Sequence, residues 1–460
     1  MKVTVLNGSP KGDQSVTMQY ILYIQKKFPM HEFKILNVAQ QINRLENNEE
    51  KLREVIEEIN TSDAIIWGTP VYVMLVPSQL KQFIELIWKK YFTNIFENKY
   101  AAIFLTSIHF YDHISLNYLR AICDDLNMKY IGHFAADTFD LLIRNKRKQL
   151  LLFAENFFDS IANQIPTIKQ YDKLRFREFE YQPAMNENKI SVNSKKVLIL
   201  TDSADESSNL FKMVQRFKNS FVEDIELINI NDVDVKGGCI ACLKCGYDHQ
   251  CAYDGKDGFR SFWENKMTKA DIIIMAGQII DRYISSRWKM IFDRAFYNNH
   301  TPTLIGKQVG FIISGPLAQI PNISEIFQAF IEFQGSNFVG FVSDEFGDSK
   351  EIDSLIFNLA IQLVKFSKSN YIKPATFLGE AGTKIFRDDV FGRNRFIFQA
   401  DHKYYEEHGL YDTFPQNDKR AIEMNKKLIP LMQIEKIRKK MDFKEELLKP
   451  FKKVLEDSNK

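Results

Sequence analysis

The sequence predicts an α/β fold, with two doubly wound parallel sheets in tandem and a mainly helical C-terminal tail. Three observations lead to this prediction. Short β-rich runs alternate with helical stretches in the first half, which is the pattern of parallel sheets that carry helices on both faces. The same order of elements returns after a polar linker, "YQPAMNENKISVNSK". Beyond about residue 376 the order is not repeated, and the chain reads as helical.

The first half supplies its elements in a regular order. Strands are predicted at "KVTVL", "HEFKILNV", "DAIIWG" and "AAIFLTS", and helices at about 15–27, 49–60 and 78–91. The strands are rich in β-branched and aromatic residues, which fit a buried pleated surface. The helix at 49–60 is polar and amphipathic, as expected of a helix that covers one face of a sheet.

The second half repeats this pattern, which indicates an internal duplication. Ser9 corresponds to Ser203 at an offset of 194 residues. Later matches keep an offset of 208, and they pair Asp63 with Asp271, Ser78 with Ser286, Lys81 with Lys289, Glu85 with Asp293, and Thr106 with Ser314. A constant offset over such a length is difficult to obtain by chance. We therefore expect domains at 1–170 and 195–375, with the tail at 376–460.

The composition narrows the class of protein. The chain has 460 residues, 45% of them hydrophobic, so a large packed core is expected. Its net charge is only +2, so neither nucleic acid nor a membrane is indicated as partner. The opening "MKVTVLNGSP" reads as a strand and a turn, not as a signal peptide. No apolar run approaches the roughly 18–20 residues that span a bilayer. We expect a cytoplasmic protein.

Three loops follow strands of the first repeat, at the sheet edge where ligands bind in open α/β folds. They are "NGSPKGDQSVT", "GTPVYV" and "TSIHFYD". The first offers the hydroxyls of Ser9, Ser15 and Thr17 beside a helix start, which suits a phosphate, although a simple capped turn is the alternative. In the second, Tyr72 could stack on a flat ring or simply pack. In the third, His109 is a polar candidate, although a lone histidine is more often structural.

These loops resemble the flavodoxin-like NAD(P)H-dependent FMN reductase family, over most of residues 1–165. The resemblance implies that the first loop holds the phosphate of FMN and that the other two border its ring. Carried over position by position, it implies FMN contacts from Ser9, Lys11, Ser15, Val16, Thr17, Pro70, Val71, Tyr72, Val73, Thr106, Ser107 and His109. It also implies NAD(P)H as possible co-substrate, a small-molecule or small-protein electron donor or acceptor, and a possible homodimer.

Four of the five cysteines lie in one loop of the second repeat, Cys239, Cys242, Cys245 and Cys251. The loop falls where the second repeat has gained 14 residues. In a reducing compartment, clustered cysteines more often bind metal or do redox chemistry than form disulfides. Three cysteines at i, i+3 and i+6 favour a [4Fe–4S] cluster, with zinc or redox-active thiols as alternatives. The fifth, Cys123, is expected to be a buried structural thiol.

The cysteine loop resembles that of the iron–sulfur flavoproteins, in which one domain holds both FMN and a cluster. Here the two functions look divided, because the turn of the second repeat reads "TDSADESSN" and its carboxylates would repel a phosphate. The hydroxyl and amide groups in that turn, on Ser203, Ser207, Ser208 and Asn209, leave open a second flavin site.

The expected function is an FMN-dependent oxidoreductase or electron-transfer flavoprotein, with NAD(P)H or a small carrier as donor and a [4Fe–4S] relay. The alternatives are a non-enzymatic electron carrier, a flavin or quinone reductase with a structural zinc, and a metal or redox sensor. No side chain is expected to act as acid or base in hydride transfer, because the cofactors carry that chemistry. The aromatic tail could form a lid over the flavin, but packing across the domains is the favoured use.

Overall fold

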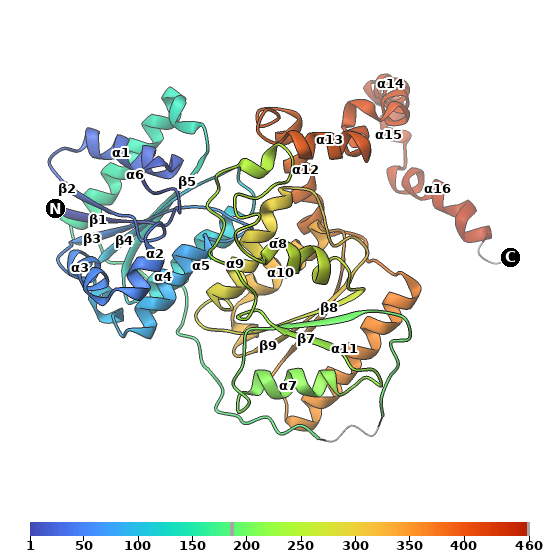
Figure 1. The fold of residues 1–460 in the computed structure, drawn as a ribbon. Helices are drawn as coiled ribbons and strands as arrows, with labels where there is room; N and C mark the ends of the chain where they lie inside the picture. Colours follow the sequence, from blue (N-terminus) through green and yellow to red (C-terminus); the bar gives the residue numbers. More distant parts are fainter. Residues whose placement is uncertain (185–187, 458–460) are drawn as a thin grey trace. The chain divides into compact units, whose positions relative to one another are not determined.

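The computed structural model describes residues 1–184 and 188–457 (Figure 1). Residues 185–187 of the expected linker and 458–460 of the expected tail lie outside the described residues. The chain divides into two compact units, Met1–Asp401 and His402–Lys460. The first unit contains both sheets.

The first sheet has five parallel strands in the order β2-β1-β3-β4-β5. The strands are β1 (Lys2–Asn7), β2 (Glu32–Leu36), β3 (Ala64–Pro70), β4 (Tyr100–Ser107) and β5 (Lys129–Asp137). Helices α1 (Val16–Lys27) and α6 (Arg144–Ala162) cover one face, and α2 (Ile42–Asn47), α3 (Glu49–Asn60), α4 (Ser78–Lys89) and α5 (Asp112–Asp125) belong to the other. Every predicted element of the first repeat is present, and β5 is an additional edge strand.

The second sheet repeats this topology, in the order β10-β9-β8-β6-β7. Its strands are β6 (Val197–Thr201), β7 (Glu226–Asn229), β8 (Ile272–Gln278), β9 (Gln308–Ser314) and β10 (Asn337–Ser343). Helices α7 (Asn209–Lys218) and α11 (Ser349–Ser369) share one core with the sheet, and α8 (Phe259–Phe262), α9 (Ser286–Ala295) and α10 (Pro321–Phe333) lie in the other. Two doubly wound parallel sheets in tandem are therefore confirmed.

One hydrophobic cluster is common to the two repeats, and it includes Leu52 and Leu80 in the first repeat and Trp288 and Phe327 in the second, whereas the opposite face of each sheet has a cluster of its own. Helices α4 and α9 pack against each other in the shared cluster. Polar contacts there are reciprocal. The main-chain N–H of Ser78 donates to Asp293 at 2.7 Å, and that of Ser286 donates to Glu85 at 2.6 Å.

The C-terminal region is mainly helical, as predicted. Helix α12 (Phe377–Phe391) packs on α10 within the first unit. It is followed by α13 (Gln399–Glu407), α14 (Lys419–Gln433), α15 (Glu435–Lys440) and α16 (Phe443–Asp457). Among the helices of the described residues, none is long and apolar enough to cross a membrane. The expected domain boundaries near 170, 195 and 375 stay predictions.

Candidate functional site

A cavity of about 450 Å³ lies at the carboxyl ends of β1, β3 and β4, and we call it the large cavity. This edge is where parallel sheets place their ligands. Ten of the twelve residues expected to contact FMN line it: Ser9, Lys11, Ser15, Val16, Pro70, Val71, Tyr72, Val73, Thr106 and Ser107. The three predicted loops therefore meet at one site, and its volume is typical of small-molecule pockets.

The first loop combines a tight turn with a helix start. Gly12 has a φ of 58°, a left-handed conformation that glycine adopts without strain. Ser15 precedes α1 and its hydroxyl makes no capping hydrogen bond to the helix. Lys11 is partly buried, and burial lowers the pKa of its ammonium. A cation, hydroxyls and the positive end of a helix dipole together favour an anion here.

Thr17 and His109 are placed away from the cavity lining. The hydroxyls of Thr17 and Thr106 lie 2.6 Å apart, so Thr17 contacts the lining residue Thr106 through a hydrogen bond. His109 is exposed and its Nδ1 lies 2.8 Å from Asp112. Direct FMN contacts from these two residues stay predictions.

The second loop is held in an unusual backbone conformation. Val73 and Met74 have φ values of 41° and 66°, which branched and bulky side chains rarely adopt. Tyr72 exchanges main-chain hydrogen bonds with Leu75, and its carbonyl accepts one from the Lys289 ammonium at 2.8 Å. Burial raises the pKa of Tyr72 well above its usual range, so its hydroxyl stays protonated. A lysine of the second repeat therefore fixes a loop of the first.

Sequence analysis did not anticipate the rest of the cavity wall. The second repeat contributes Phe292, Asp293, Ala295, Phe296, Asn299, His300, Phe330, Phe333 and Gln334. A segment after α12, together with the end of that helix, contributes Phe386, Asp389, Asn394, Ile397 and Phe398. We call residues 386–398 the lid segment. Its aromatic content was a signal in the sequence for this segment, and the alternative that it covers a flavin stays a prediction.

The lid segment is attached to the first repeat by an ion pair. The Arg393 guanidinium donates two hydrogen bonds to the Asp137 carboxylate, at 2.7 and 2.8 Å, and a third to Asp389 at 2.7 Å. The same guanidinium lies 5.3 Å from the ring centre of Phe139, which lines the cavity. Arg393 thus joins the lid segment to the end of β5.

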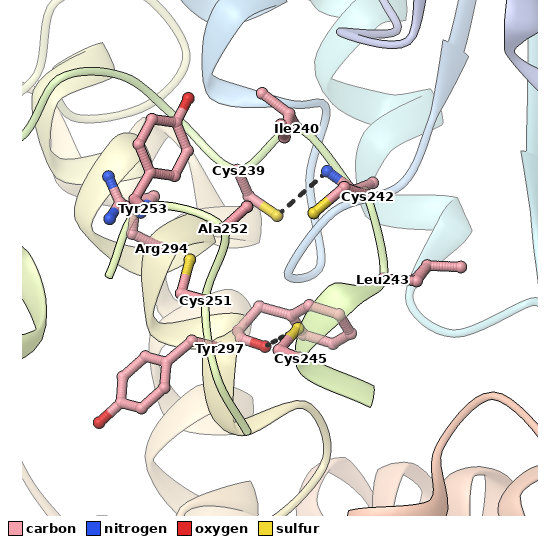
Figure 2. A pocket seen from close by; sticks show the side chains of 12 residues that line it. Cys239, Ile240, Cys242, Leu243, Cys245, Cys251, Ala252, Tyr253, Arg294 and Tyr297 are labelled. Carbon is pink, nitrogen blue, oxygen red and sulfur yellow. Dashed lines mark hydrogen bonds between the residues drawn. The ribbon is translucent and has the colours of Figure 1, made fainter. Parts of the chain in front are cut away.

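The four clustered cysteines line a second, small cavity of about 20 Å³ (Figure 2). Figure 2 shows the four sulfur atoms around a common space within the cysteine loop, residues 239–251. Ala241 and Leu243, on either side of Cys242, have left-handed φ values of 46° and 59°. Strained backbone of this kind is found where a loop must wrap closely around a ligand.

The four thiols line the same small cavity, and their charges influence one another. Burial raises the pKa of Cys239 and of Cys245 to about 12, and the neighbouring cysteines add to the effect. The Sγ atom of Cys245 lies 3.2 Å from Asn299 Oδ1. Within residues 1–184 and 188–457, no group of three or more His, Cys, Asp or Glu side chains is arranged to hold a metal ion. Cys123 is buried in α5, as expected.

Comparison with known proteins identifies the fold and the family. The sequence model of the NADPH-dependent FMN reductases matches residues 1–140 and again residues 195–325. The chain belongs to the NADPH-dependent FMN reductase family. It is therefore an oxidoreductase of a flavoprotein family whose cofactor is FMN, and the two matches confirm the tandem duplication.

Solved structures resemble about a third of this chain. An NADH:FMN oxidoreductase is 19% identical, with 35% of this chain and 89% of that chain covered and a TM-score of 0.30. The NAD(P)H:(acceptor) oxidoreductase of Paracoccus denitrificans is 20% identical, with 35% and 97% covered and a TM-score of 0.30. An FMN-dependent NADH-azoreductase of Bacillus anthracis is 16% identical, with 36% and 99% covered and a TM-score of 0.26. These similarities are low, so we assign the family from the family model alone. No curated protein matches the chain.

In this protein the two cavities share a wall. Cys239, Ala241 and Leu243 line both the large cavity and the cavity between the cysteines. The side-chain amide of Gln79, in α4 of the first repeat, donates to the carbonyl of Cys239 at 3.1 Å. The cysteine loop of the second repeat is thus part of the site of the first.

In the second sheet, the edge at the carboxyl ends of the strands is covered by the segment that precedes β6, which includes Phe179 and Tyr181. The Asn209 amide donates to the carbonyl of Phe179 at 2.8 Å and accepts from the N–H of Tyr181 at 2.8 Å. Asp202 accepts from the Ser285 hydroxyl at 2.5 Å, and burial raises its pKa to about 6. Polar groups of this edge are therefore engaged within the protein.

Proposed function

We propose that this protein is an FMN-dependent oxidoreductase that binds FMN in the large cavity and a [4Fe–4S] relay on the four clustered cysteines. NAD(P)H, or a small electron carrier, is the donor. The observation that carries the proposal is the wall that the two cavities share, formed by Cys239, Ala241 and Leu243. A cluster there would lie next to the flavin, and close spacing is what a relay requires.

The chain offers a fitting set of groups for FMN. Ser9, Lys11 and Ser15 would hold the phosphate at the start of α1, where positive charge and hydroxyls meet. Pro70 to Val73 would border one side of the ring, with Thr106 and Ser107 at its edge. Thr17 and His109 remain candidates that act through neighbouring residues.

The cysteine loop offers the donor set that iron–sulfur clusters use, four thiolates. Zinc holds its sulfurs about 2.3 Å from a single ion, whereas a cubane cluster separates its cysteine ligands more widely. Within the described residues no group of side chains is arranged to hold a metal ion, so the four cysteine side chains must move for either zinc or a cluster to bind. The enclosed space is only about 20 Å³, so the thiols must turn outward as a cluster is built, and the exposed Cys242 has the most room to do so.

Bound FMN supplies hydride acceptance and the exchange between two-electron and one-electron transfer, and a cluster supplies single-electron transfer. Overall, one NAD(P)H is oxidised to NAD(P)⁺, and its two electrons reduce one two-electron acceptor or two one-electron acceptors. The chain itself would bind and orient the cofactors and shield them from water. Phe292, Phe330 and Phe333 exclude water from the large cavity, and Lys289 fixes the loop that carries Tyr72.

Activity measurements separate this proposal from its alternatives. The purified protein is loaded with FMN and mixed with NADH or NADPH under anaerobic conditions, with ferricyanide as one-electron acceptor. We expect bleaching of the flavin absorbance and steady ferricyanide reduction. A non-enzymatic carrier would take electrons from a reduced protein partner and show no steady NAD(P)H oxidation. A reductase with a structural zinc would contain one zinc and no sulfide per chain and would still reduce ferricyanide with NAD(P)H.

The homodimer is a separate proposal. The two repeats and the lid segment line the large cavity within one chain, so dimer formation is not needed to build it. Sedimentation of the holoprotein at two concentrations tests it.

A further inference from the structure

A buried cation lies in the wall of the cavity between the cysteines (Figure 2). Arg294, near the end of α9, lines this cavity together with the four clustered cysteines. Its side chain is only 2% exposed. At the offset of 208 residues, the equivalent position of the first repeat is Leu86 in α4, which is buried and apolar. The charge is therefore a feature of the repeat that carries the cysteines.

Contacts within the second repeat fix the guanidinium of Arg294 in place. It donates to both carboxylate oxygens of Asp257, at 2.7 and 3.0 Å, and to the carbonyl of Gly237 at 3.0 Å. Its central carbon lies 4.1 Å from the ring centre of Tyr253 and 4.9 Å from that of Phe259. The Asp257 side chain is buried as well. The pair is thus held on several sides and is shielded from water.

The charges of this pair are not placed evenly around the cavity. Arg294 lines the cavity and Asp257 does not, so the positive member of the pair lies nearer to the cysteines. Burial acts to lower the pKa of Arg294, whereas Asp257 and the charge of Cys251 raise it. Among the described residues, the buried Nε atom of Arg294 has no hydrogen-bond acceptor. Buried donors are rarely left unpaired, so this wall favours a negatively charged occupant.

We propose that Arg294 supplies the positive charge that stabilises the reduced state of a cluster bound by the four cysteines, and so raises its reduction potential. This inference rests on the proposed function. The potential of an iron–sulfur cluster depends on its net charge, on hydrogen bonds to its sulfurs and on its exposure to solvent. A cation buried beside the cluster acts strongly, because charges away from water are weakly screened.

The step concerned is a one-electron transfer. One electron passes from the reduced flavin to the cluster, and no bond forms or breaks at the cluster. The cysteine site therefore becomes more negative by one charge, which a positive neighbour favours. Asp257 offsets part of the positive charge of Arg294. Loss of Arg294 and loss of Asp257 should consequently shift the potential in opposite directions, a result that a merely structural role of the pair does not produce.

Opposite substitutions of the pair test the proposal. The full-length protein with its cofactors is titrated anaerobically with dithionite in the presence of redox dyes, and the reduced cluster is quantified by electron paramagnetic resonance. In Arg294→Gln we expect the equilibrium constant for reduction of the cluster to fall about tenfold, which corresponds to about 59 mV for a one-electron couple. In Asp257→Asn the constant should rise, because the cation loses its neutralising partner.

Arg282 offers a matched control in the same repeat. It is a buried arginine that donates to both carboxylate oxygens of Asp125, at 2.6 and 2.8 Å, and it does not line the cavity between the cysteines. Arg282→Gln should leave the potential unchanged, although it costs stability. Arg294→Lys retains the charge, so its potential should stay closer to that of the wild type. Asp257→Asn and Arg294→Lys keep the test decisive if Arg294→Gln does not fold.

The outcomes separate this inference from the proposed function. Unchanged potentials in Arg294→Gln and Asp257→Asn, or shifts of both in the same direction, would overturn the inference and leave the proposed function intact. If the anaerobically purified wild-type protein contains neither iron nor sulfide, the proposed relay fails, and the role of Arg294 fails with it.

Discussion

The Lys289 ammonium, in α9 of the second repeat, donates to the main-chain carbonyl of Tyr72 in the first repeat at 2.8 Å. The reciprocal contact is present too. Lys81, in α4 of the first repeat, donates to Asp281 at 3.0 Å, and Asp281 lies in the equivalent loop of the second repeat. Each repeat therefore holds a loop of the other. The second repeat is an integral part of the site on the first, and not only a carrier of the cysteines.

Replacement of Lys289 by methionine should destabilise the protein strongly. Lys289 and Asp293 form a fully buried ion pair, and Asp293 also accepts from the N–H of Ser78. Removal of one partner leaves a buried charge uncompensated, which costs about 3–5 kcal/mol in the free energy of unfolding. Urea denaturation measures it. The double variant Lys289→Met/Asp293→Asn should recover much of the loss, because the amide is neutral and its oxygen still accepts from Ser78. A loss in the single variant below about 1 kcal/mol, as for surface pairs, would contradict the account.

Replacement of Lys11 by glutamate should weaken FMN binding selectively. The side chain lines the large cavity beside the start of α1, where we place the phosphate. We expect the dissociation constant for FMN to rise at least about tenfold, which corresponds to 1.4 kcal/mol. Titration by flavin fluorescence quenching measures it. Riboflavin lacks the phosphate and should bind equally to both proteins, and Lys26→Glu at the exposed end of α1 is the matched control. Equal weakening for riboflavin would place the phosphate elsewhere.

Loss of Arg393 should loosen the lid segment without unfolding the protein. The guanidinium is partly exposed, so its ion pair with Asp137 adds little to global stability. It does fix a segment whose Asp389 and Asn394 line the large cavity. We expect FMN to dissociate several times faster from Arg393→Ala, as followed by stopped-flow fluorescence after dilution. Lys384→Ala removes an exposed pair on α12 and should leave this rate unchanged. An unchanged rate in Arg393→Ala would show that the segment does not retain the flavin.

Asp202 should make stability fall as pH rises through weakly acidic values. Burial raises the pKa of this carboxyl from 3.8 to about 6 in the folded protein. The folded state then binds more protons than the unfolded state between about pH 4 and 6, so the free energy of unfolding decreases over that range. The loss is on the order of 2–3 kcal/mol, since one pKa unit corresponds to about 1.4 kcal/mol. In Asp202→Asn this part of the pH dependence should disappear from urea denaturation curves. An identical pH dependence in both proteins would mean that Asp202 ionises normally.

Much of the fold follows from local patterns in the sequence. Strand composition and helix periodicity are properties of short segments, so the alternation in the first repeat predicts its sheet. The loops at 7–17, 68–73 and 106–112 come directly after strands, which is why their convergence could be anticipated. The edge strand β5, Lys129–Asp137, was not anticipated, because its mixture of lysine, glycine, histidine and aromatic residues lacks a clear alternation.

The remaining wall of the site depends on contacts between distant parts of the chain. His300 and Phe330 reach the large cavity only because α4 and α9 pack together, and no local pattern specifies that docking. One signal was present. Ser78, Lys81 and Glu85 recur as Ser286, Lys289 and Asp293, and these duplicated polar residues lie at the interface of the repeats. Polar residues repeated on helices that otherwise pack into a core indicate a polar interface between the copies.

Cys123, the cysteine outside the loop, is a matched control for substitutions of the four clustered cysteines. Cys242→Ser replaces an exposed ligand candidate and should remove most of the iron while FMN is retained. Cys123→Ala replaces a buried thiol in α5, outside the cluster, and should retain the iron. Iron and flavin are measured per chain in both variants. Equal iron content in the two would contradict ligation by the cysteine loop.

Anaerobic purification followed by iron, sulfide, zinc and FMN analysis tests the central claim most directly. The account places FMN on the first repeat and a cluster on the second, so it predicts about four iron and four sulfide with one FMN per chain. One zinc without sulfide, or FMN without any metal at the four cysteines, would contradict it.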